Sequence, residues 1–457
     1  MIGMVSMKKL ASITEGKLVG ENVSFTDVST DSRNLKAGDL FVALSGENFN
    51  GNDYVEAAKE RGACGALVSR LQACDFPQVK VTDTLQGLRA LASSNREHFT
   101  GPMFAVTGSS GKTTVKEMLA SVLSVAAPVF YTHGNLNNHI GVPLSLLRLD
   151  ATHHYAVLEL GASSEGEILF NTQLVKPDVA IITNAGEAHL GVFGSREAIV
   201  RTKGEILATL KADQCAVLNL DDPSYGVWNS MVSETRVISF SASGNINADV
   251  YATEVQLGVE GSGFNVHVDG TSFPVFVPAA GLHNVANALA VAAAAWAKSI
   301  SAEQIAEGLS RFKGAHSRLQ FKQVGAIRVI DDSYNANPSS VCAALEVLAG
   351  QPGYRVAILG DMAELGEAAS SLHEKVGQKA ADLALDQVLA VGEYANFYTR
   401  PVGEKGKALT DKEALFCAVK TLIDREQNVV LLVKGSRSAK METLIEKLEA
   451  HMAGQKC

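Results

Sequence analysis

Apolar residues occur along the chain as short continuous runs separated by amphipathic stretches, and this pattern predicts an α/β protein. In the first hundred residues it predicts strands at 39–44, 65–68 and 79–81 and helices at 55–61 and 85–98. The segment Phe99-Thr-Gly-Pro102 then carries the glycine and proline of a linker. We therefore expect a small α/β domain at residues 1–100.

A central block follows, in which apolar runs alternate with helical stretches. The expected strands lie at 104–107, 155–160, 179–183 and 216–220, and the first helix covers 112–124. Strands spaced by helices in this way favour a parallel sheet that is covered on both faces. Around Asp269-Gly270, apolar and polar residues alternate, which predicts an antiparallel hairpin appended to the parallel core. We assign residues 101–313 to this central domain.

The last third of the chain again alternates strands and helices. Strands are expected at 327–331, 355–359, 387–391 and 429–433, with helices near 339–349, 371–385, 412–424 and 439–451. This order predicts a doubly wound, Rossmann-like domain at residues 314–457. No G-x-G-x-x-G fingerprint follows its first strand, so we do not assign NAD to it.

Composition and charge narrow the classes of function. Hydrophobic residues make up 46% of the 457 residues and charged residues 19%, which is ordinary for globular α/β proteins. The net charge is −9, from 40 basic and 49 acidic residues, and no block of Lys or Arg occurs. Because nucleic-acid affinity rests on clustered cations, we expect no nucleic-acid partner.

The spacing of the cysteines and the hydropathy of the chain indicate in which cellular compartment the protein is expected. None of the six cysteines is spaced as C-x-x-C, which is typical of a reduced, cytoplasmic protein. The N-terminus lacks the apolar core of a signal peptide. The most apolar stretch, residues 286–297, is shorter than the roughly 20 residues that span a bilayer. We expect that stretch to be a buried helix and the chain to be cytoplasmic, without membrane insertion.

A glycine-rich loop follows the strand at 104–107 and opens a helix. Its glycines let backbone N–H groups converge on phosphate oxygens, and the helix N-terminus adds a partial positive charge. Lys112 can reach the β- and γ-phosphates of ATP, and Thr113 can ligate Mg²⁺. The alternative is a Gly/Ser turn that happens to precede Lys and Thr. The expected ATP-binding residues of this loop are Gly108, Ser109, Ser110, Gly111, Lys112, Thr113 and Thr114.

Three polar residues fall near the carboxyl ends of the expected parallel strands, where open sheets bind ligands. Glu159 ends the strand at 155–160, His189 follows the strand at 179–183, and Lys203 comes shortly after. Mg²⁺ usually takes one or two carboxylates together with substrate phosphates, which favours Glu159 as a ligand. Taken alone, His189 is more often a structural histidine, and Lys203 is more often a solvated surface charge.

Jointly and in order, the motifs of this chain resemble those of the Mur ligase family over nearly its whole length. They are Thr107-Gly-Ser-Ser-Gly-Lys-Thr-Thr114, Glu159-Leu-Gly-Ala-Ser163, Asn184-Ala-Gly-Glu-Ala-His189, Leu282-His-Asn-Val-Ala-Asn287, Ser317-Arg318 and Asp331-Asp-Ser-Tyr-Asn-Ala-Asn-Pro338. Each is a modest signal by itself, whereas the ordered set is specific.

The resemblance implies a first domain for a UDP-sugar substrate, a central ATPase and a C-terminal Rossmann-like domain. It implies that Mg²⁺ is held by Glu159, His189 and a carbamylated Lys203, which would join Thr113 of the glycine-rich loop as ligands. A carbamate supplies an anionic oxygen ligand, whereas an ammonium would repel the metal. The resemblance further implies contacts to adenine, phosphate and ribose from Asn287, Arg318 and Asp332.

Two motifs are similar to those of the family member that adds D-alanyl-D-alanine: Gly360-Asp-Met-Ala-Glu-Leu-Gly366 and Gly134-Asn-Leu-Asn-Asn-His-Ile-Gly-Val-Pro143. The stretch from Ser29 to Leu44 is shared with the member that adds the third amino acid, but the string Asp-Asn-Pro-Arg typical of that member is absent. This subgroup implies a UDP-substrate pocket whose contacts are Thr30, Ser32, Arg33, Asn135 and Asn138.

The acceptor amine is placed near Asn335, Asn337 and Asp361. Asn-Ala-Asn-Pro is also good turn chemistry, and an Asp after a strand often only caps a helix, so a structural role for these residues remains the alternative.

The function implied by the resemblance is ATP-dependent ligation. The carboxylate of UDP-N-acetylmuramoyl-tripeptide would be phosphorylated by ATP, and the amine of D-alanyl-D-alanine would attack the acyl phosphate to give a peptidoglycan precursor. We expect a monomer with ATP and Mg²⁺ as its cofactors. The alternatives are a phosphate-loop switch protein, in which hydrolysis drives a shape change, and a related ligase that adds a different amino acid.

Overall fold

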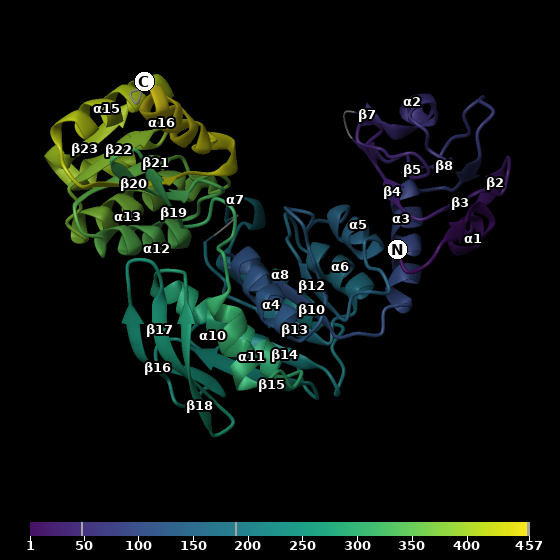
Figure 1. Cartoon of the computed structure of the whole chain (residues 1–457), viewed down its shortest axis with the longest axis horizontal. Coiled ribbons are helices and arrows are strands. Elements are labelled where there is room, and N and C mark those ends of the chain that lie inside the picture. Colours follow the sequence, from purple (N-terminus) through teal and green to yellow (C-terminus); the bar gives the residue numbers. More distant parts are fainter. Residues whose placement is uncertain (47–48, 188–189, 455–457) are drawn as a thin grey trace. The chain divides into compact units, whose positions relative to one another are not determined.

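The structure is a computed structural model that describes residues 1–46, 49–187 and 190–454 (Figure 1). The chain divides into two compact units. The first unit comprises Met1–Ala105, Ala127–Gly161 and Glu167–Val179, and the second comprises Val106–Ala126, Ala162–Gly166 and Ala180–Cys457. The chain thus alternates between the units along its central part.

The first unit contains a five-stranded sheet in the order β2-β9-β8-β5-β4. The strands are β2 (Lys17–Val19), β4 (Val28–Ser29), β5 (Leu40–Val42), β8 (Gly65–Val68) and β9 (Gln78–Lys80). Strands β4, β5, β8 and β9 are parallel, whereas β2 is antiparallel to β9. The wholly buried strands β5 and β8 occupy the interior of this sheet, as their continuous apolar runs predict.

Helices complete the first unit. They are α1 (Met7–Ile13), α2 (Val55–Glu60), α3 (Thr84–Glu97), α5 (Gly141–Leu147) and α6 (Glu167–Val175). Helix α3 begins where the Asp83 carboxylate accepts the backbone N–H groups of Leu85 and Gln86. Two arginines of α3 tie it to α6, because Arg89 donates to the Phe170 carbonyl at 2.6 Å and Arg96 to that of Val175 at 2.7 Å.

A nine-stranded sheet has the order β11-β12-β10-β13-β14-β15-β16-β17-β18. Its strands are β10 (Met103–Thr107), β11 (Val129–Tyr131), β12 (Tyr155–Glu159), β13 (Val179–Ile182), β14 (Cys215–Asn219), β15 (Arg236–Ser241), β16 (Val250–Leu257), β17 (Ser262–Val268) and β18 (Thr271–Val277). Strands β14, β15 and β16 pair in parallel, and β16, β17 and β18 pair antiparallel. The predicted hairpin is confirmed: Asp269 and Gly270 have φ of 49° and 73°, as its two-residue turn requires.

Helices α4 (Lys112–Ala126), α10 (Leu282–Trp296) and α11 (Ala302–Ser310) pack together in the second unit. Most of α10 is buried, as its alanine-rich sequence predicts. Gly308 of α11 permits close packing, because a Cβ there would overlap the backbone of Val122 in α4. Helix α8 (Arg196–Gly204) is anchored by Trp228 of α9 (Tyr225–Ser230), which donates to the Val200 carbonyl at 3.0 Å.

The C-terminal part of the second unit is a six-stranded sheet in the order β19-β20-β24-β21-β22-β23. Its strands are β19 (Gln320–Val324), β20 (Ile327–Asp332), β21 (Tyr354–Gly360), β22 (Gln387–Val391), β23 (Gly406–Leu409) and β24 (Val429–Lys434). All adjacent pairs are parallel except β19 with β20.

Helices cover both faces of this sheet, as Figure 1 shows for the green and yellow end of the chain. One core cluster includes residues of α12 (Pro338–Ala349) and α13 (Ala369–Asp382), and a second includes residues of α15 (Lys412–Arg425) and α16 (Glu442–Gly454). The expected doubly wound, Rossmann-like arrangement is therefore present.

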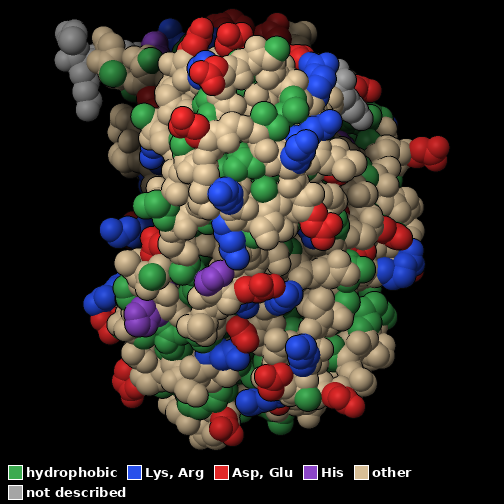
Figure 2. Space-filling view, turned by 90° about the vertical axis from the view of Figure 1, so that its right-hand side faces the viewer, with side chains coloured by type: hydrophobic (Ala, Val, Ile, Leu, Met, Phe, Trp, Pro, Cys, Tyr) green, Lys and Arg blue, Asp and Glu red, His purple; other side chains and the backbone are tan. Residues whose placement is uncertain are grey.

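The surface charges, the cysteines and the hydropathy of the helices can be compared with what the sequence predicted. On the face that Figure 2 shows, Lys and Arg side chains are interspersed with Asp and Glu. The cysteines at 64, 74, 215, 342 and 417 are free thiols. Among the residues that the structure describes, none of the helices has the length and apolar content needed to cross a bilayer.

Candidate active site

The glycine-rich loop joins β10 to α4, as predicted, and its two glycines are required by their surroundings. Gly108 has φ of +148°, and a Cβ there would overlap the hydroxyl of Thr183. Gly111 has φ of +84°, and a Cβ there would lie 2.5 Å from Oδ1 of Asn287. Both a left-handed backbone and a close neighbour thus exclude larger residues.

The segment after β13 holds the loop in place. The Ser109 N–H donates to the Asn184 carbonyl, and the Ser110 N–H donates to Oδ1 of Asn184, each at 3.0 Å. The Thr183 hydroxyl donates to the Ser110 carbonyl at 2.6 Å. The bracing role of Asn184 was not predicted, although this residue comes only two positions after the end of β13. The loop is therefore preorganised before any ligand enters.

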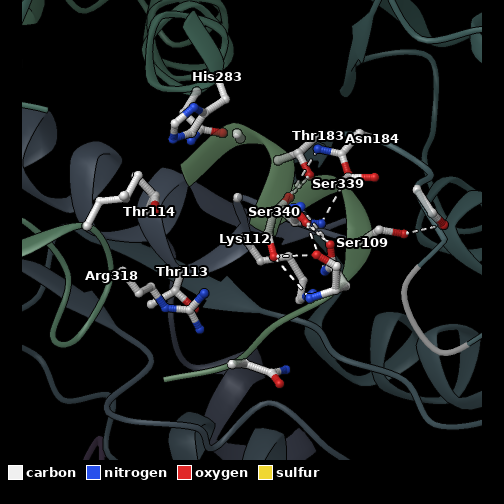
Figure 3. Close-up of a pocket in the computed structure, with 18 of the residues that line it drawn as sticks. Ser109, Lys112, Thr113, Thr114, Thr183, Asn184, His283, Arg318, Ser339 and Ser340 are labelled. Atoms are coloured by element: carbon white, nitrogen blue, oxygen red, sulfur yellow. Dashed lines mark hydrogen bonds between the residues drawn. The ribbon is translucent and has the colours of Figure 1, made fainter. Parts of the chain in front are cut away.

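Beside the loop lies a cavity of about 770 Å³ (Figure 3). It brings together residues that are far apart in the sequence, namely the loop, the segments after β13 and β14, the start of α10, and the ends of β20 and β24. The predicted site residues that line it are Ser109, Ser110, Gly111, Lys112, Thr113, Thr114, Asn287, Arg318, Asp332, Asn335 and Asn337. Gly108 and Asp361 are not among its lining residues.

Lys112, the first residue of α4, supplies a cation at the mouth of the loop. Its ammonium donates to the Gly108 carbonyl at 2.6 Å, so the side chain curls back over the loop (Figure 3). A cation held here, together with the α4 N-terminus and the loop N–H groups, forms an environment that suits phosphate.

A buried ion pair forms part of the cavity wall. The Lys434 ammonium lies 2.5 Å from a carboxylate oxygen of Asp332 and also donates to the Asn335 carbonyl at 2.9 Å. Burial raises the pKa of Asp332 and lowers that of Lys434, while the opposite charge of each partner counters these shifts. Lys434 was not predicted, although it ends β24 beside the predicted Asp332 at the end of β20.

Arg318 lies in a strained segment at the edge of the cavity. Its guanidinium is 4.5 Å from the centroid of the Tyr334 ring. On either side of it, Ser317 and Leu319 have positive φ values of 51° and 48°. Backbone strain of this kind is concentrated at functional sites, where surrounding contacts fix a particular geometry. Here the Leu319 N–H is held by the Asp332 carboxylate at 3.2 Å.

The first turns of α10 carry a chain of amides. Asn287 donates to Oδ1 of Asn284 at 3.1 Å, and Asn284 donates to the Ala280 carbonyl at 2.9 Å. His283 lines the same cavity, and desolvation together with the charge of Lys434 lowers its pKa to about 4. The histidine is therefore neutral at pH 7.

This lowered pKa predicts a pH dependence of stability. Between pH 6.5 and about 4, the unfolded chain binds a proton at His283 that the folded chain does not bind. Stability therefore falls as the pH is lowered through this window. We expect His283→Asn to lose less thermal stability than the wild type over the same window, as measured by calorimetric melting. Other groups are unchanged between the two proteins, so parallel declines would contradict the assignment.

Asn337 connects the phosphate loop to α12. Its amide donates to the Ser110 hydroxyl at 3.1 Å, and its Oδ1 accepts the Ser340 N–H at 2.9 Å as the N-cap of the helix. Oδ1 of Asn335 accepts a hydrogen bond from the Ala336 N–H, as is typical of an Asn in a turn.

Replacing Asn337 by alanine should remove both contacts. We expect a loss of about 1 kcal/mol in the free energy of unfolding, which is typical of a lost N-cap, and also weaker ADP binding because Ser110 loses a partner. Asp411 caps α15 away from the cavity, so Asp411→Ala is a matched control. The control should lose similar stability and retain its ADP affinity in calorimetric titration. Equal ADP affinity in the two variants would contradict the role of Asn337.

The predicted metal ligands are distributed between the two units. In the first unit, Glu159 ends β12, is only 2% exposed, and accepts from the Asn137 amide at 2.8 Å. In the second unit, Thr113 lies in the first turn of α4, and Lys203 is buried in α8. His189 lies outside the described residues. Among those described, no three His, Cys, Asp or Glu side chains gather as a metal site.

These residues fit a magnesium ion only in part. A buried carboxylate such as that of Glu159 suits the oxygen preference of Mg²⁺, and Asn137 fixes its orientation. An unmodified Lys203 is a cation and does not fit, whereas its carbamate would. The metal set therefore remains a prediction.

The predicted UDP-substrate residues lie in the first unit. Thr30, Ser32 and Arg33 are in the turn after β4, where Arg33 is 82% exposed and pairs with Asp31 at 2.9 Å. That guanidinium lowers the pKa of Asp31 to about 2. Asn135 is exposed, and Oδ1 of Asn138 accepts the N–H of Gly141, the first residue of α5, at 2.8 Å.

Asp361 follows β21, and its carboxylate stabilises a turn elsewhere in the C-terminal sheet domain. Its carboxylate accepts the N–H groups of Glu393 and Tyr394 at 2.8 and 3.0 Å, just before α14 (Ala395–Thr399). These N–H groups precede the first helical residue of α14, so the contact stabilises the turn and is not a side-chain cap of the helix. Its role at the acceptor amine stays a prediction.

Three segments of the sequence match known domain families. Residues 24–96 match the Mur ligase family catalytic domain, residues 106–295 the Mur ligase middle domain, and residues 317–437 the Mur ligase glutamate ligase domain. The chain is 41% identical to the UDP-N-acetylmuramoyl-tripeptide–D-alanyl-D-alanine ligase of Escherichia coli (strain K12), over 97% of this chain and 98% of the relative. The chain belongs to the Mur ligase family. A Bacillus subtilis (strain 168) ligase of the same name is 34% identical over 97% of this chain and 98% of its own length.

Solved Mur ligase structures agree with the fold. MurF from Acinetobacter baumannii superposes with a TM-score of 0.93 at 38% identity, covering 98% of this chain and 99% of that one. The MurF ligase from Thermotoga maritima in complex with ADP gives a TM-score of 0.84 at 28% identity, covering 94% and 98%. This Mur ligase therefore has the same architecture as solved members of its family, one of which is bound to ADP.

Proposed function

We propose that this Mur ligase joins D-alanyl-D-alanine to UDP-N-acetylmuramoyl-tripeptide, with ATP converted to ADP and phosphate. The observation that carries the proposal is the likeness, over 97% of the chain, to a ligase named for these two substrates. The preorganised phosphate loop beside a cavity of about 770 Å³ supports it, since this site suits a nucleoside triphosphate. The product is a pentapeptide precursor of peptidoglycan.

The reaction needs activation of a carboxylate, because a free carboxylate does not condense with an amine in water. An oxygen of the tripeptide carboxylate attacks the γ-phosphorus of ATP, and the bond to the β–γ bridging oxygen breaks to release ADP. The amine of D-alanyl-D-alanine then attacks the acyl carbon. The tetrahedral intermediate loses phosphate and a proton from nitrogen, which leaves the new amide.

The residues of the cavity act mainly by charge and position. Lys112, the loop N–H groups and the α4 N-terminus offset the charge that develops on the transferring phosphoryl group. Mg²⁺ supplies further charge neutralisation when bound, and we assign it to Thr113, Glu159, His189 and Lys203 as a carbamate. Asn287, Arg318 and Asp332 are assigned to adenine, phosphate and ribose, and Lys434 holds the Asp332 carboxylate in place.

We assign the substrates to the three domains expected from the sequence. Residues 1–100 take the UDP substrate through Thr30, Ser32 and Arg33, with Asn135 and Asn138 from the following segment. Residues 101–313 take ATP, and residues 314–457 supply Asn335, Asn337 and Asp361 to the acceptor. The protein is proposed to work in the cytoplasm as a monomer.

Mass spectrometry of the product tests this function. The purified protein is incubated with Mg-ATP, UDP-N-acetylmuramoyl-tripeptide and D-alanyl-D-alanine, and separately with D-alanine or a diamino acid in place of the dipeptide. We expect a product heavier than the tripeptide substrate by the dipeptide less one water, and only with the dipeptide. A product formed with a single amino acid would indicate a related ligase of different specificity.

A further inference from the structure

The turn Asp361–Gly366, which we call the cavity turn, forms part of the cavity wall in an unfavourable backbone conformation. It follows β21, and its residues Ala363 and Glu364 line the cavity. Glu364 has φ of +64° and Gly366 has φ of +59°. A left-handed conformation at a residue other than glycine costs on the order of 1–3 kcal/mol and persists only where neighbouring structure imposes it. The contacts that impose it should therefore be identifiable.

One set of contacts comes from α7 (Leu190–Phe193), which belongs to the segment after β13. The Gly191 N–H donates to the Glu364 carbonyl at 2.8 Å. A Cβ on Gly191 would overlap the backbone of Leu365 and Gly366, so the two chains meet backbone to backbone. Leu190 packs against the core of the C-terminal sheet, and Glu187 pairs with Lys375 of α13 at 3.1 Å.

A second set comes from His373 of α13, which is fully buried. Its Nε2 accepts the Met362 N–H at 3.0 Å, and its Nδ1 lies 2.6 Å from the Ala369 carbonyl, to which it donates. The ring is stacked on Tyr394 with centroids 4.6 Å apart. Burial lowers the pKa of His373, which keeps the ring neutral and Nε2 available as an acceptor.

We propose that Gly191 and His373 are positioning residues for the ligation, because together they hold the cavity turn against the nucleotide cavity. Gly191 lies in α7, in the segment that follows β13. His373 lies in α13, which belongs to the C-terminal sheet domain. The cavity turn therefore keeps its place in the cavity wall only while the segment after β13 and the C-terminal sheet domain remain in contact. The proposal rests on the ligase function argued above.

The two residues call for different substitutions. Gly191→Ala adds one methyl group that the Gly366 backbone cannot accommodate, which should move α7 away from the cavity turn. Gly226→Ala in α9 is the matched control, since an added Cβ there meets nothing within 4 Å. His373→Leu removes the acceptor for Met362, and His373→Gln restores an acceptor oxygen on a side chain of similar reach.

Kinetics and hydrogen exchange together test the proposal. Misplacement of cavity groups by about 1 Å lowers turnover by up to about 100-fold, so we expect Gly191→Ala and His373→Leu to lower kcat by about 10- to 100-fold. Gly226→Ala should match the wild type, and His373→Gln should recover part of kcat. Exchange of backbone amides in residues 361–366 should be faster in the impaired variants, while residues 108–114 exchange as in the wild type.

The possible results separate this proposal from the proposed function. Unchanged kcat and unchanged exchange at residues 361–366 in Gly191→Ala would overturn the positioning role. Faster exchange throughout the chain would overturn it too, since that pattern indicates a general loss of stability. If the wild type itself shows no ligation, the function fails, and the exchange pattern still decides whether Gly191 and His373 hold the cavity turn.

Discussion

Replacement of Lys112 by alanine should lower the rate of ligation by about 100- to 1,000-fold, the effect typical of removing one preorganised group that stabilises a developing negative charge. The Lys112 ammonium already lies over the phosphate loop, 2.6 Å from the Gly108 carbonyl, and needs little rearrangement to meet a phosphoryl group. The measurement is steady-state ADP release with both substrates present. Thermal stability should change little, because the side chain is only partly buried.

A control keeps this prediction specific. Lys407→Ala removes an exposed lysine on β23 that is not among the residues lining the cavity, and should keep the wild-type rate. A Lys112→Ala protein that retains more than about a tenth of the wild-type kcat would contradict the role given to the loop cation.

Replacement of Lys434 by methionine should have the largest effect on stability. It leaves the Asp332 carboxylate buried without its counter-charge, and breaking a buried pair in this way costs about 3–5 kcal/mol. Lys434 is 3% exposed and lies 2.5 Å from that carboxylate. Denaturant unfolding measures the loss, and ADP titration measures the expected weakening of nucleotide binding.

The double variant Asp332→Asn with Lys434→Met distinguishes stability from binding. With both charges gone, most of the lost stability should return, since a neutral pair buries no uncompensated charge. ADP affinity should stay low, because the double variant lacks the Asp332 carboxylate that is proposed to contact the ribose. If the single Lys434→Met variant is as stable as the wild type, the pair is not the buried ion pair described above.

Elements with continuous apolar runs could be predicted from the sequence nearly to the residue. Strands β8 and β22 begin and end where predicted, because each is a mainly apolar run that is almost wholly buried. Strands β19 and β23 were missed. Both are edge strands with mixed polar and apolar residues that are only partly buried, so they lack the apolar run on which the prediction depends.

In the candidate site, too, some residues could be predicted from the sequence and others could not. The phosphate loop could be predicted because its signal is local: a strand, a glycine-rich turn and a helix lie consecutively in the chain. Asn184 and Lys434 were missed because their roles depend on partners about 75 and 100 residues away in the sequence. Both nevertheless come at the carboxyl end of a parallel strand, so applying to every strand the rule that selected Glu159 would have found them.

The account as a whole is tested most directly by ADP release from Mg-ATP, measured without added substrate, with UDP-N-acetylmuramoyl-tripeptide alone, with D-alanyl-D-alanine alone, and with both. A ligase with this site should release ADP steadily only when both substrates are present, with one ADP for each amide bond formed. Steady ATP hydrolysis that is indifferent to both substrates would contradict the ligase and leave a phosphate-loop ATPase of the switch class.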